Sequence, residues 1–220
     1  MARLCDPRTA FATLRRLKRL RRRERLKPAA AAGMMELGLV TSNAGKVREL
    51  AAVLEPLGHE VTQREFGYPE VQAPSLEAVV EFGLEWLAQN HPGEALLIDD
   101  AGLFVDALGG FPGVYSRHAW DTIGPAGVLA LLGNGEERSA EFRCVLGLLL
   151  PDGGHQLFHG SCRGSVTRAP RGDGGFGYDP IFIPKGDERT FAELPLAEKN
   201  GVSHRGRALA ELVEYLGTSG

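Results

Sequence analysis

A short apolar segment followed by a polar loop and an amphipathic helix limits the folds open to this chain more than any other feature. Residues 37–40 (LGLV) are apolar, and a Ser-Asn-Ala-Gly turn follows them. Apolar side chains then recur at helical spacing from Val47 to Leu57, with Asn43 suited to cap the helix and Gly58 to end it. Because a strand that leads through a tight loop into a helix is the unit of layered folds, we expect an α/β protein.

The rest of the chain extends this pattern. Apolar periodicity predicts further helices at 75–90, near 126–132 and at about 201–216. An apolar strand is predicted at 95–98, and alternating apolar residues predict another across 142–148. The turn at 151–154 (PDGG) sends the chain back from His155 as a long hairpin. Helices that alternate with strands, together with a central hairpin, predict a mixed sheet with helical layers rather than a pure barrel.

Charge is distributed unevenly along the 220 residues. Residues 1–34 hold eleven Lys or Arg and two acidic residues, Asp6 and Glu24. Of the chain's 25 basic and 28 acidic residues, 14 and 26 remain for residues 35–220, so that part is strongly acidic. An acidic body repels polyanions, so a phosphate substrate would need a locally positive pocket and a divalent cation.

This asymmetry divides the chain into a basic, disordered extension (1–34) and one globular domain (35–220). Three interpretations of the extension remain open: a flexible or loosely helical basic arm, an anchor for nucleic acid or a membrane surface, or upstream sequence translated from a misplaced start codon. Cys5, Cys144 and Cys162 have no metal-type spacing and their odd number gives no disulfide framework. No run of 18 apolar residues or secretory signal is present, so we expect a soluble cytoplasmic protein that does not enter a membrane.

Two segments near the predicted strand ends carry candidate phosphate chemistry. In residues 41–46 (TSNAGK), backbone N–H groups at a helix start and Lys46 would converge on an anion, although the spacing is not that of a Walker A loop. The alternative is an ordinary capped turn. Asp99 and Asp100 follow an apolar strand, and carboxylates suit Mg²⁺, whereas the alternative is an exposed turn. Glu70, in a Pro-marked connection, is by itself a solvated glutamate.

Two later segments suggest contacts to a nucleotide. Residues 172–177 (GDGGFG) satisfy the spacing of a dinucleotide-binding loop, but a strand-like segment follows instead of a helix. Phe176 or Tyr178 would instead stack on a base whose edge Asp179 reads; the alternative is a hairpin loop with a packing aromatic. Further cationic candidates at the start of the last helix would complete a positive pocket or form a solvated helix start; they are Lys199, His204 and Arg205.

Taken together, these segments resemble the non-canonical purine nucleoside-triphosphate pyrophosphatase family, the inosine triphosphatase or HAM1-like proteins. The matching motifs occur in family order across residues 36–216: TSNAGKVREL, YPEVQ, IDDAGLFVDALGGFPGVYS, GGFGYDPIFIP, TFAEL and EKNGVSHRGRAL. The resemblance implies a two-lobed α/β fold with an elongated mixed central sheet flanked by helices, an active site in the cleft between lobes, and a homodimer. It also implies Mg²⁺-dependent hydrolysis of ITP, dITP and XTP to the monophosphate and pyrophosphate, which removes them from the nucleotide pool.

The resemblance also implies roles for single residues. Glu70 and Asp100 would bind Mg²⁺, and Asp100 would also be the general base. Ala101 stands where many relatives have serine, so one hydroxyl contact to substrate is missing. The triphosphate would be held by Thr41, Ser42, Asn43, Ala44, Gly45 and Lys46; the base by Phe176, Gly177, Tyr178 and Asp179; and base or phosphate by Lys199, His204 and Arg205.

Selectivity for these bases would come from donors aimed at the C6 oxygen, which adenine replaces with an amino group; we nominate His204 and Arg205. Two other classes of function remain. The extension makes a nucleic-acid-binding module conceivable, and Ala101 leaves room for a nucleotide-binding regulator with an inactive site.

Overall fold

The computed structural model describes residues 34–69 and 71–218. The predicted role of Glu70 and the interpretations of residues 1–33 therefore concern parts of the chain outside the described residues.

Across the described residues, six strands form one mixed sheet in the order β2-β1-β3-β4-β5-β6. β1 runs parallel to β2 and β3, and the pairs from β3 to β6 are antiparallel. This agrees with the mixed sheet and central hairpin expected from the sequence. The strands are β1 (Glu36–Val40), β2 (Glu60–Arg64), β3 (Leu96–Val105), β4 (Ser139–Leu149), β5 (His155–Val166) and β6 (Phe182–Pro184).

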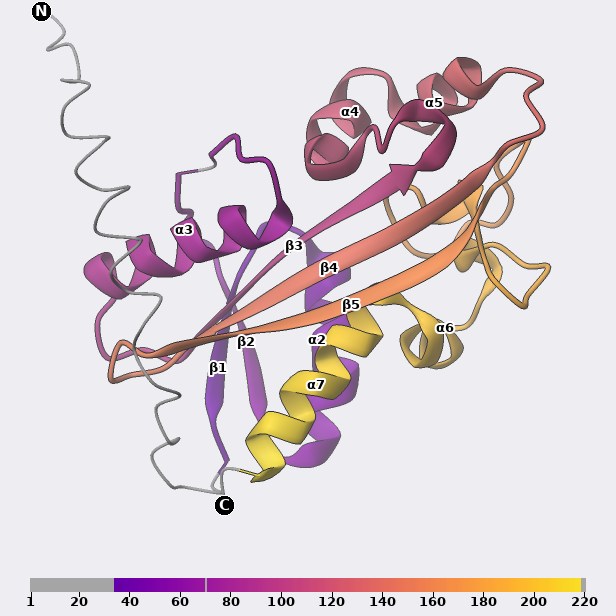
Figure 1. Cartoon of the computed structure of the whole chain (residues 1–220). Coiled ribbons are helices and arrows are strands. Elements are labelled where there is room, and N and C mark those ends of the chain that lie inside the picture. The colour runs from indigo at the N-terminus through magenta and orange to yellow at the C-terminus, as the bar shows by residue number, and fades with distance from the viewer. Residues whose placement is uncertain (1–33, 70, 219–220) are drawn as a thin grey trace, which may run out of the picture.

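Helices cover both faces of the sheet, as Figure 1 shows: α3 lies on one face, and α2 and α7 lie on the other. α4 and α5 lie at the end of β4 and β5 that is opposite the turn joining these two strands. Short 3₁₀ turns are η1 (Glu55–Leu57), η2 (Asp106–Leu108), η3 (Gly113–Tyr115), η4 (Asp179–Ile181) and η5 (Phe191–Glu193). The α-helices are α2 (Ala44–Leu54), α3 (Leu76–Asn90), α4 (Ser116–Thr122), α5 (Gly124–Leu132), α6 (Leu196–Val202) and α7 (His204–Thr218).

The buried apolar residues form clusters that define two lobes. In the first lobe, Leu97 of β3 packs with α2 and α7, while its neighbour Ile98 packs with α3 on the opposite face. In the second lobe, Leu103 of the same strand packs with Val128 of α5 and Phe182 of β6. The first lobe thus has one cluster on each face of the sheet, and the second lobe has a third cluster. Because β3 contributes to all three, this long strand joins the lobes.

Local sequence accounts for the first strand-loop-helix unit. Its predicted N-cap is confirmed, whereas α2 ends at Leu54 and the 3₁₀ turn η1 continues to the predicted stop at Gly58. The Asn43 side chain accepts hydrogen bonds from the backbone N–H groups of Gly45 and Lys46, at 2.8 and 3.4 Å. At the other end Gly58 adopts φ 91°, the left-handed conformation that glycine tolerates best.

The predicted strand at 95–98 is too short. β3 continues through Asp99 and Asp100 to Val105, and residues 96–105 pair with β4 throughout. Asp disfavours strands locally, but the long antiparallel ladder with β4 outweighs that preference. The exposed Asp-Asp turn that the sequence left open is therefore excluded.

The final helix also differs from the prediction, because it begins at His204 and a separate helix, α6, precedes it. Ser203 separates the two, and its hydroxyl accepts a hydrogen bond from the Gly206 N–H at 3.1 Å. A Cβ at Gly206 would overlap the Asn200 carbonyl, so glycine lets the two helices cross closely. β2 and α4 were not predicted at all.

The pairing of β3 creates an opening in the sheet. β1 pairs with β3 only through Leu96 and Leu97, and β1 ends at Val40. Beyond Leu97 the edge of β3 that faced β1 is therefore no longer covered by that strand. In open α/β sheets, ligands bind at the carboxyl ends of strands where the strand order changes direction, so this opening is the expected position for a site.

None of the helices in the described part of the chain is both long and apolar enough to cross a membrane.

Candidate active site

A cavity of about 490 Å³ lies at this opening. Its walls come from the loop after β1, the connection before α3, the middle of β3, the start of α4, the glycine-rich loop before η4, and the start of α7. Most of the residues that the sequence singled out meet there. The cavity is lined by Thr41, Ser42, Asn43, Lys46, Asp100, Ala101, Phe176, Gly177, Tyr178, Asp179, His204 and Arg205.

Ala44, Gly45 and Lys199 are the predicted residues within the described ranges that do not line this cavity. Gly45 instead permits a close approach, because a Cβ there would overlap the Phe176 ring. Lys199 is buried. Tyr68 and Val71, on either side of Glu70 in the sequence, both line the cavity.

The adjacent carboxylates of β3 have opposite surroundings, because successive side chains of a strand point to opposite faces. Asp99 shares the face of Leu97 and its side chain is completely buried, 2.8 Å from the Lys46 ammonium and 2.9 Å from the Arg205 guanidinium. Burial alone would raise the pKa of Asp99, but these two cations hold it well below its usual range. Asp99 is thus a fixed anion. Asp100 is only half-buried, and its Oδ1 accepts the Ala101 N–H at 3.0 Å.

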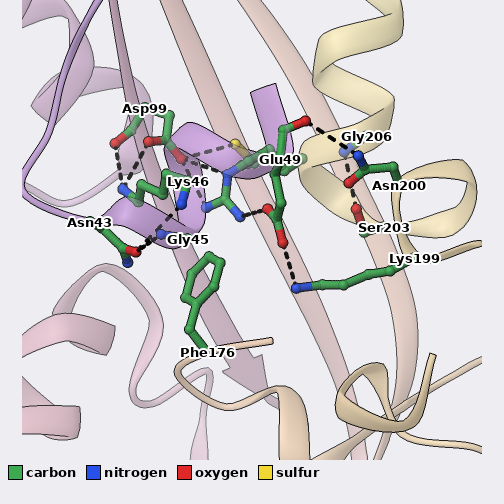
Figure 2. Close-up of polar contacts among 12 residues, drawn as sticks. Asn43, Gly45, Lys46, Glu49, Asp99, Phe176, Lys199, Asn200, Ser203 and Gly206 are labelled. Carbon is green, nitrogen blue, oxygen red and sulfur yellow. Dashed lines mark hydrogen bonds and ion pairs between the residues drawn. The ribbon is translucent and has the colours of Figure 1, made fainter. Parts of the chain in front are cut away.

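Asp99 belongs to a network of buried ion pairs, most of whose members are labelled in Figure 2. Glu49 of α2 accepts hydrogen bonds from Arg205 and from Lys199, both at 2.6 Å. Lys199 also contacts Asp179 at 2.6 Å. We name this set the buried ion network; its members are Lys46, Glu49, Asp99, Asp179, Lys199 and Arg205.

The buried ion network joins α2, β3, η4, α6 and α7, and its three cations balance its three carboxylates. Burial raises the pKa of Asp179 despite the nearby Lys199. The pKa of Glu49 is lowered, because Arg205 and Lys199 outweigh its burial. Removing one partner of a buried pair leaves an uncompensated charge, which costs about 3–5 kcal/mol. The network therefore fixes the cavity floor and contributes no net positive charge to it.

The loop after β1 is less open to an anion than the sequence suggested. The N–H groups of Gly45 and Lys46 donate to Asn43, and the Asn43 N–H donates to the Thr41 hydroxyl at 3.1 Å. These N–H groups already have acceptors in this structure. The Lys46 side chain is 20% exposed and is the basic group that the first turn of α2 offers to the cavity.

Phe176 joins the glycine-rich loop to this floor. Its ring lies 4.9 Å from the Lys199 ammonium and 5.4 Å from the Arg205 guanidinium, within the range of cation–π attraction. Its N–H donates to Asp179 at 2.8 Å. Figure 2 shows the ring directed toward the network. An aromatic face held in this way provides a surface for a planar base.

His204 is buried and stacks on Phe142, with ring centroids 4.5 Å apart and planes 7° apart. Its burial, reinforced by Arg205 and Lys199, lowers its pKa well below 6.5, so the ring is neutral. Within the described residues its Nδ1 is buried without a hydrogen-bond partner. A buried polar atom at a cavity wall is a ready position for a ligand contact.

Sequence reasoning missed Glu49 and the α4 wall. Glu49 carried a signal, because it lies three residues after Lys46 on the helix, among positions predicted to be buried. For α4 no comparable signal exists, since the helix is short. Its Ser116 hydroxyl accepts the Leu103 N–H at 2.9 Å, and its Trp120 meets Tyr178 edge-on at 5.6 Å.

The residues present fit a Mg²⁺ ion. In the described ranges no three acidic, histidine or cysteine side chains are grouped so as to hold a metal by themselves. Mg²⁺, however, binds one or two carboxylates and completes its shell with water and substrate phosphates. Asp100 offers such an oxygen donor at the cavity.

Comparison with known proteins places the chain in a family. The model of the Ham1 family matches residues 37–215. A Thermococcus kodakarensis protein named dITP/XTP pyrophosphatase is 52% identical over 182 residues, 83% of this chain and 97% of the relative. A Pyrococcus horikoshii protein of the same name is 48% identical over the same shares.

Solved structures agree with the sequence comparison. A HAM1 protein from Coxiella burnetii has a TM-score of 0.72 at 34% identity, covering 84% of this chain and all of that one. A structure from Mycobacterium abscessus, titled nucleoside-triphosphatase / dITP/XTP pyrophosphatase, has a TM-score of 0.62 at 39% identity, covering 81% of this chain and 98% of that one. This chain belongs to the Ham1 family.

Proposed function

We propose that the chain hydrolyses non-canonical purine nucleoside triphosphates (ITP, dITP and XTP) to the nucleoside monophosphate and pyrophosphate, and so removes them from the nucleotide pool. The observation that carries this proposal is one cavity lined by an acidic residue, Asp100, by Lys46 from the first turn of α2, and by the aromatic Phe176. The names of the Thermococcus and Pyrococcus relatives support the same reaction.

The proposal includes Mg²⁺ as cofactor, held by Asp100 and Glu70. Tyr68 and Val71, which flank Glu70 in the sequence, line the same cavity as Asp100, and this supports the pairing. When bound, the ion offsets phosphate charge and makes the attacked phosphorus more electrophilic.

Asp100 is the proposed general base. It accepts a proton from a water molecule whose oxygen attacks the α-phosphorus. The bond from that phosphorus to the bridging oxygen breaks, and pyrophosphate leaves with the electron pair. Lys46, held in place by Asp99, donates hydrogen bonds to phosphate oxygens as their charge rises.

Recognition of the base is assigned to the glycine-rich loop and the start of α7. Phe176 stacks on the purine, and His204 and Arg205 direct donors toward the C6 oxygen. An amino group in its place would leave those donors unpaired, at about 1–3 kcal/mol per site, so two contacts give roughly hundredfold discrimination against adenine. Lys199, which is buried against Glu49 and Asp179, acts in this proposal by holding Asp179 in place.

A steady-state panel across ITP, XTP, ATP and GTP with Mg²⁺ tests the proposal, with pyrophosphate release as the readout. We expect kcat/KM for ITP and XTP to exceed that for ATP by about two orders of magnitude. Chelation of the metal with EDTA should abolish turnover, and added Mg²⁺ should restore it. Absence of pyrophosphate release from both ITP and XTP would overturn the assignment.

We further propose that residues 35–220 are the enzymatic unit, that the enzyme is a homodimer and that it acts in the cytoplasm. Deleting residues 1–34 should leave ITP hydrolysis intact, whereas a nucleic-acid-binding module would lose its function. Analytical ultracentrifugation of the purified chain measures its mass in solution and so tests the dimer.

A further inference from the structure

The described cations of the cavity floor already have carboxylate partners, so a triphosphate meets little net positive charge there. Lys46 and Arg205 line the cavity, but each is paired with a carboxylate of the buried ion network. His204 is neutral because its pKa is lowered. A substrate with several negative charges therefore gains little from the floor of the site, and a different basic group is needed.

Arg117 of α4 is a cavity-lining cation with a replaceable partner. Its side chain is 71% exposed and pairs with Asp121, one helical turn away, at 2.7 Å; Asp121 is itself 50% exposed. Exposed pairs of this kind are weak, because water competes for both partners and two long side chains lose freedom. A phosphate group can displace Asp121, and guanidinium binds phosphate oxygens through two parallel hydrogen bonds.

The backbone that carries Arg117 is fixed close to Asp100. Its neighbour Ser116 is buried, accepts the Leu103 N–H at 2.9 Å and donates to the Gly113 carbonyl at 2.7 Å. A Cβ at Gly102 would overlap that carbonyl, so the turn before α4 lies directly against β3 beside Ala101. The exposed guanidinium therefore extends from a turn that is packed against β3.

We propose that Arg117 binds the two phosphates that leave as pyrophosphate, exchanging its contact with Asp121 for one with substrate. This rests on the proposed function, and it adds a substrate-binding residue on α4 to the loop and helix residues that the family motifs indicated. The ligand chemistry is a diphosphate group in the presence of Mg²⁺, and the base is not involved.

Calorimetric binding of inorganic pyrophosphate, with Mg²⁺ present, tests the inference independently of turnover. Arg117→Gln should weaken pyrophosphate binding by about tenfold or more, and Arg117→Lys should recover part of the loss. Binding of IMP should change by less than about twofold. Arg163→Gln is the matched control, because Arg163 is exposed and ion-paired to Asp106 but does not line the cavity.

Several outcomes would overturn the inference. These are pyrophosphate affinity unaffected by Arg117→Gln, an equal loss for IMP, a changed ITP:ATP ratio of kcat/KM, or no pyrophosphate binding by the unaltered protein. If the protein binds pyrophosphate through Arg117 but releases none from ITP, the proposed function fails and this site stands. If it hydrolyses ITP and Arg117→Gln has no effect, only this inference fails.

Discussion

The ionic groups around the cavity fall into two regions that differ in solvation. The buried ion network forms part of the cavity floor and continues beneath it, and in it Asp99 and Glu49 are each held by two cations at 2.6 to 2.9 Å. Across the cavity, Arg117 and Asp121 form one pair that faces water. In the interior a charge that loses its partner is costly, whereas at the surface water replaces the partner at little cost. The first region is therefore suited to fix geometry, and the second is suited to exchange ligands.

Asp99→Asn should have the largest effect, because it leaves Lys46 and Arg205 facing a neutral amide in the interior. We expect the free energy of unfolding to fall by about 3–5 kcal/mol. Chemical denaturation at pH 7 measures this. A loss below about 1 kcal/mol would mean that the buried ion network does not stabilise the fold.

Asp100→Asn is the same exchange one residue later, on the other face of β3. We expect kcat for ITP to fall by at least about two orders of magnitude, because a base and a metal-binding oxygen are lost. The free energy of unfolding should change by less than about 1 kcal/mol, since the carboxylate is half-buried and the amide that replaces it has the same shape. Near-unaltered ITP hydrolysis would remove Asp100 from the mechanism.

Gly45→Ala tests the contact between the loop after β1 and the glycine-rich loop. The new methyl group would overlap the Phe176 ring, and overpacking of this kind costs about 1–3 kcal/mol. We expect a lower Tm and a higher KM for ITP. Gly201→Ala is the control, because a Cβ there has open space and the position is helical. Equal Tm values for the two variants would contradict the close packing.

The pH dependence of the free energy of unfolding should reflect the lowered pKa of His204. Its folded pKa lies well below 6.5, so above pH 6.5 neither state binds the proton and the group contributes nothing. As the pH falls below 6.5, the unfolded chain binds a proton that the folded chain excludes, and stability decreases. Between pH 7.5 and 5.5, we expect His204→Gln to lose about 1 kcal/mol less stability than the unaltered protein. Identical losses, measured by urea unfolding, would show that His204 titrates normally.

Asp121→Asn should have the smallest effect, and it tests whether Asp121 competes with phosphate for Arg117. Without its carboxylate partner, Arg117 is available to phosphate, and inhibition by pyrophosphate should strengthen by about twofold. Initial-rate inhibition with pyrophosphate at constant Mg²⁺ measures the change. Weaker inhibition would indicate that Asp121 positions Arg117 rather than competing for it.

Much of the fold followed from local patterns. The capped helix from Asn43, the helix that ends at Asn90 and the β4–β5 hairpin all have ends set by residues that act within a few positions of themselves. The continuation of β3 through Asp99 did not follow, because its cause is pairing with β4, some 45 residues away. Likewise the ordered motifs indicated which segments meet, but the motif residues alone gave no reason to separate Lys199 from the cavity wall.

The sequence by itself determined the first strand-loop-helix unit, the β4–β5 hairpin, the family and the side chains available for phosphate and base chemistry. Only the tertiary structure decided how those side chains are used. Asp99 and Asp100 are chemically identical and adjacent, yet the strand turns them to opposite faces. There the Asp99 side chain is completely buried against two cations, whereas Asp100 is half-buried at the cavity. The reason is physical: the state of a charge depends on its solvation and on partners that are distant in sequence, and these exist only once the chain is folded.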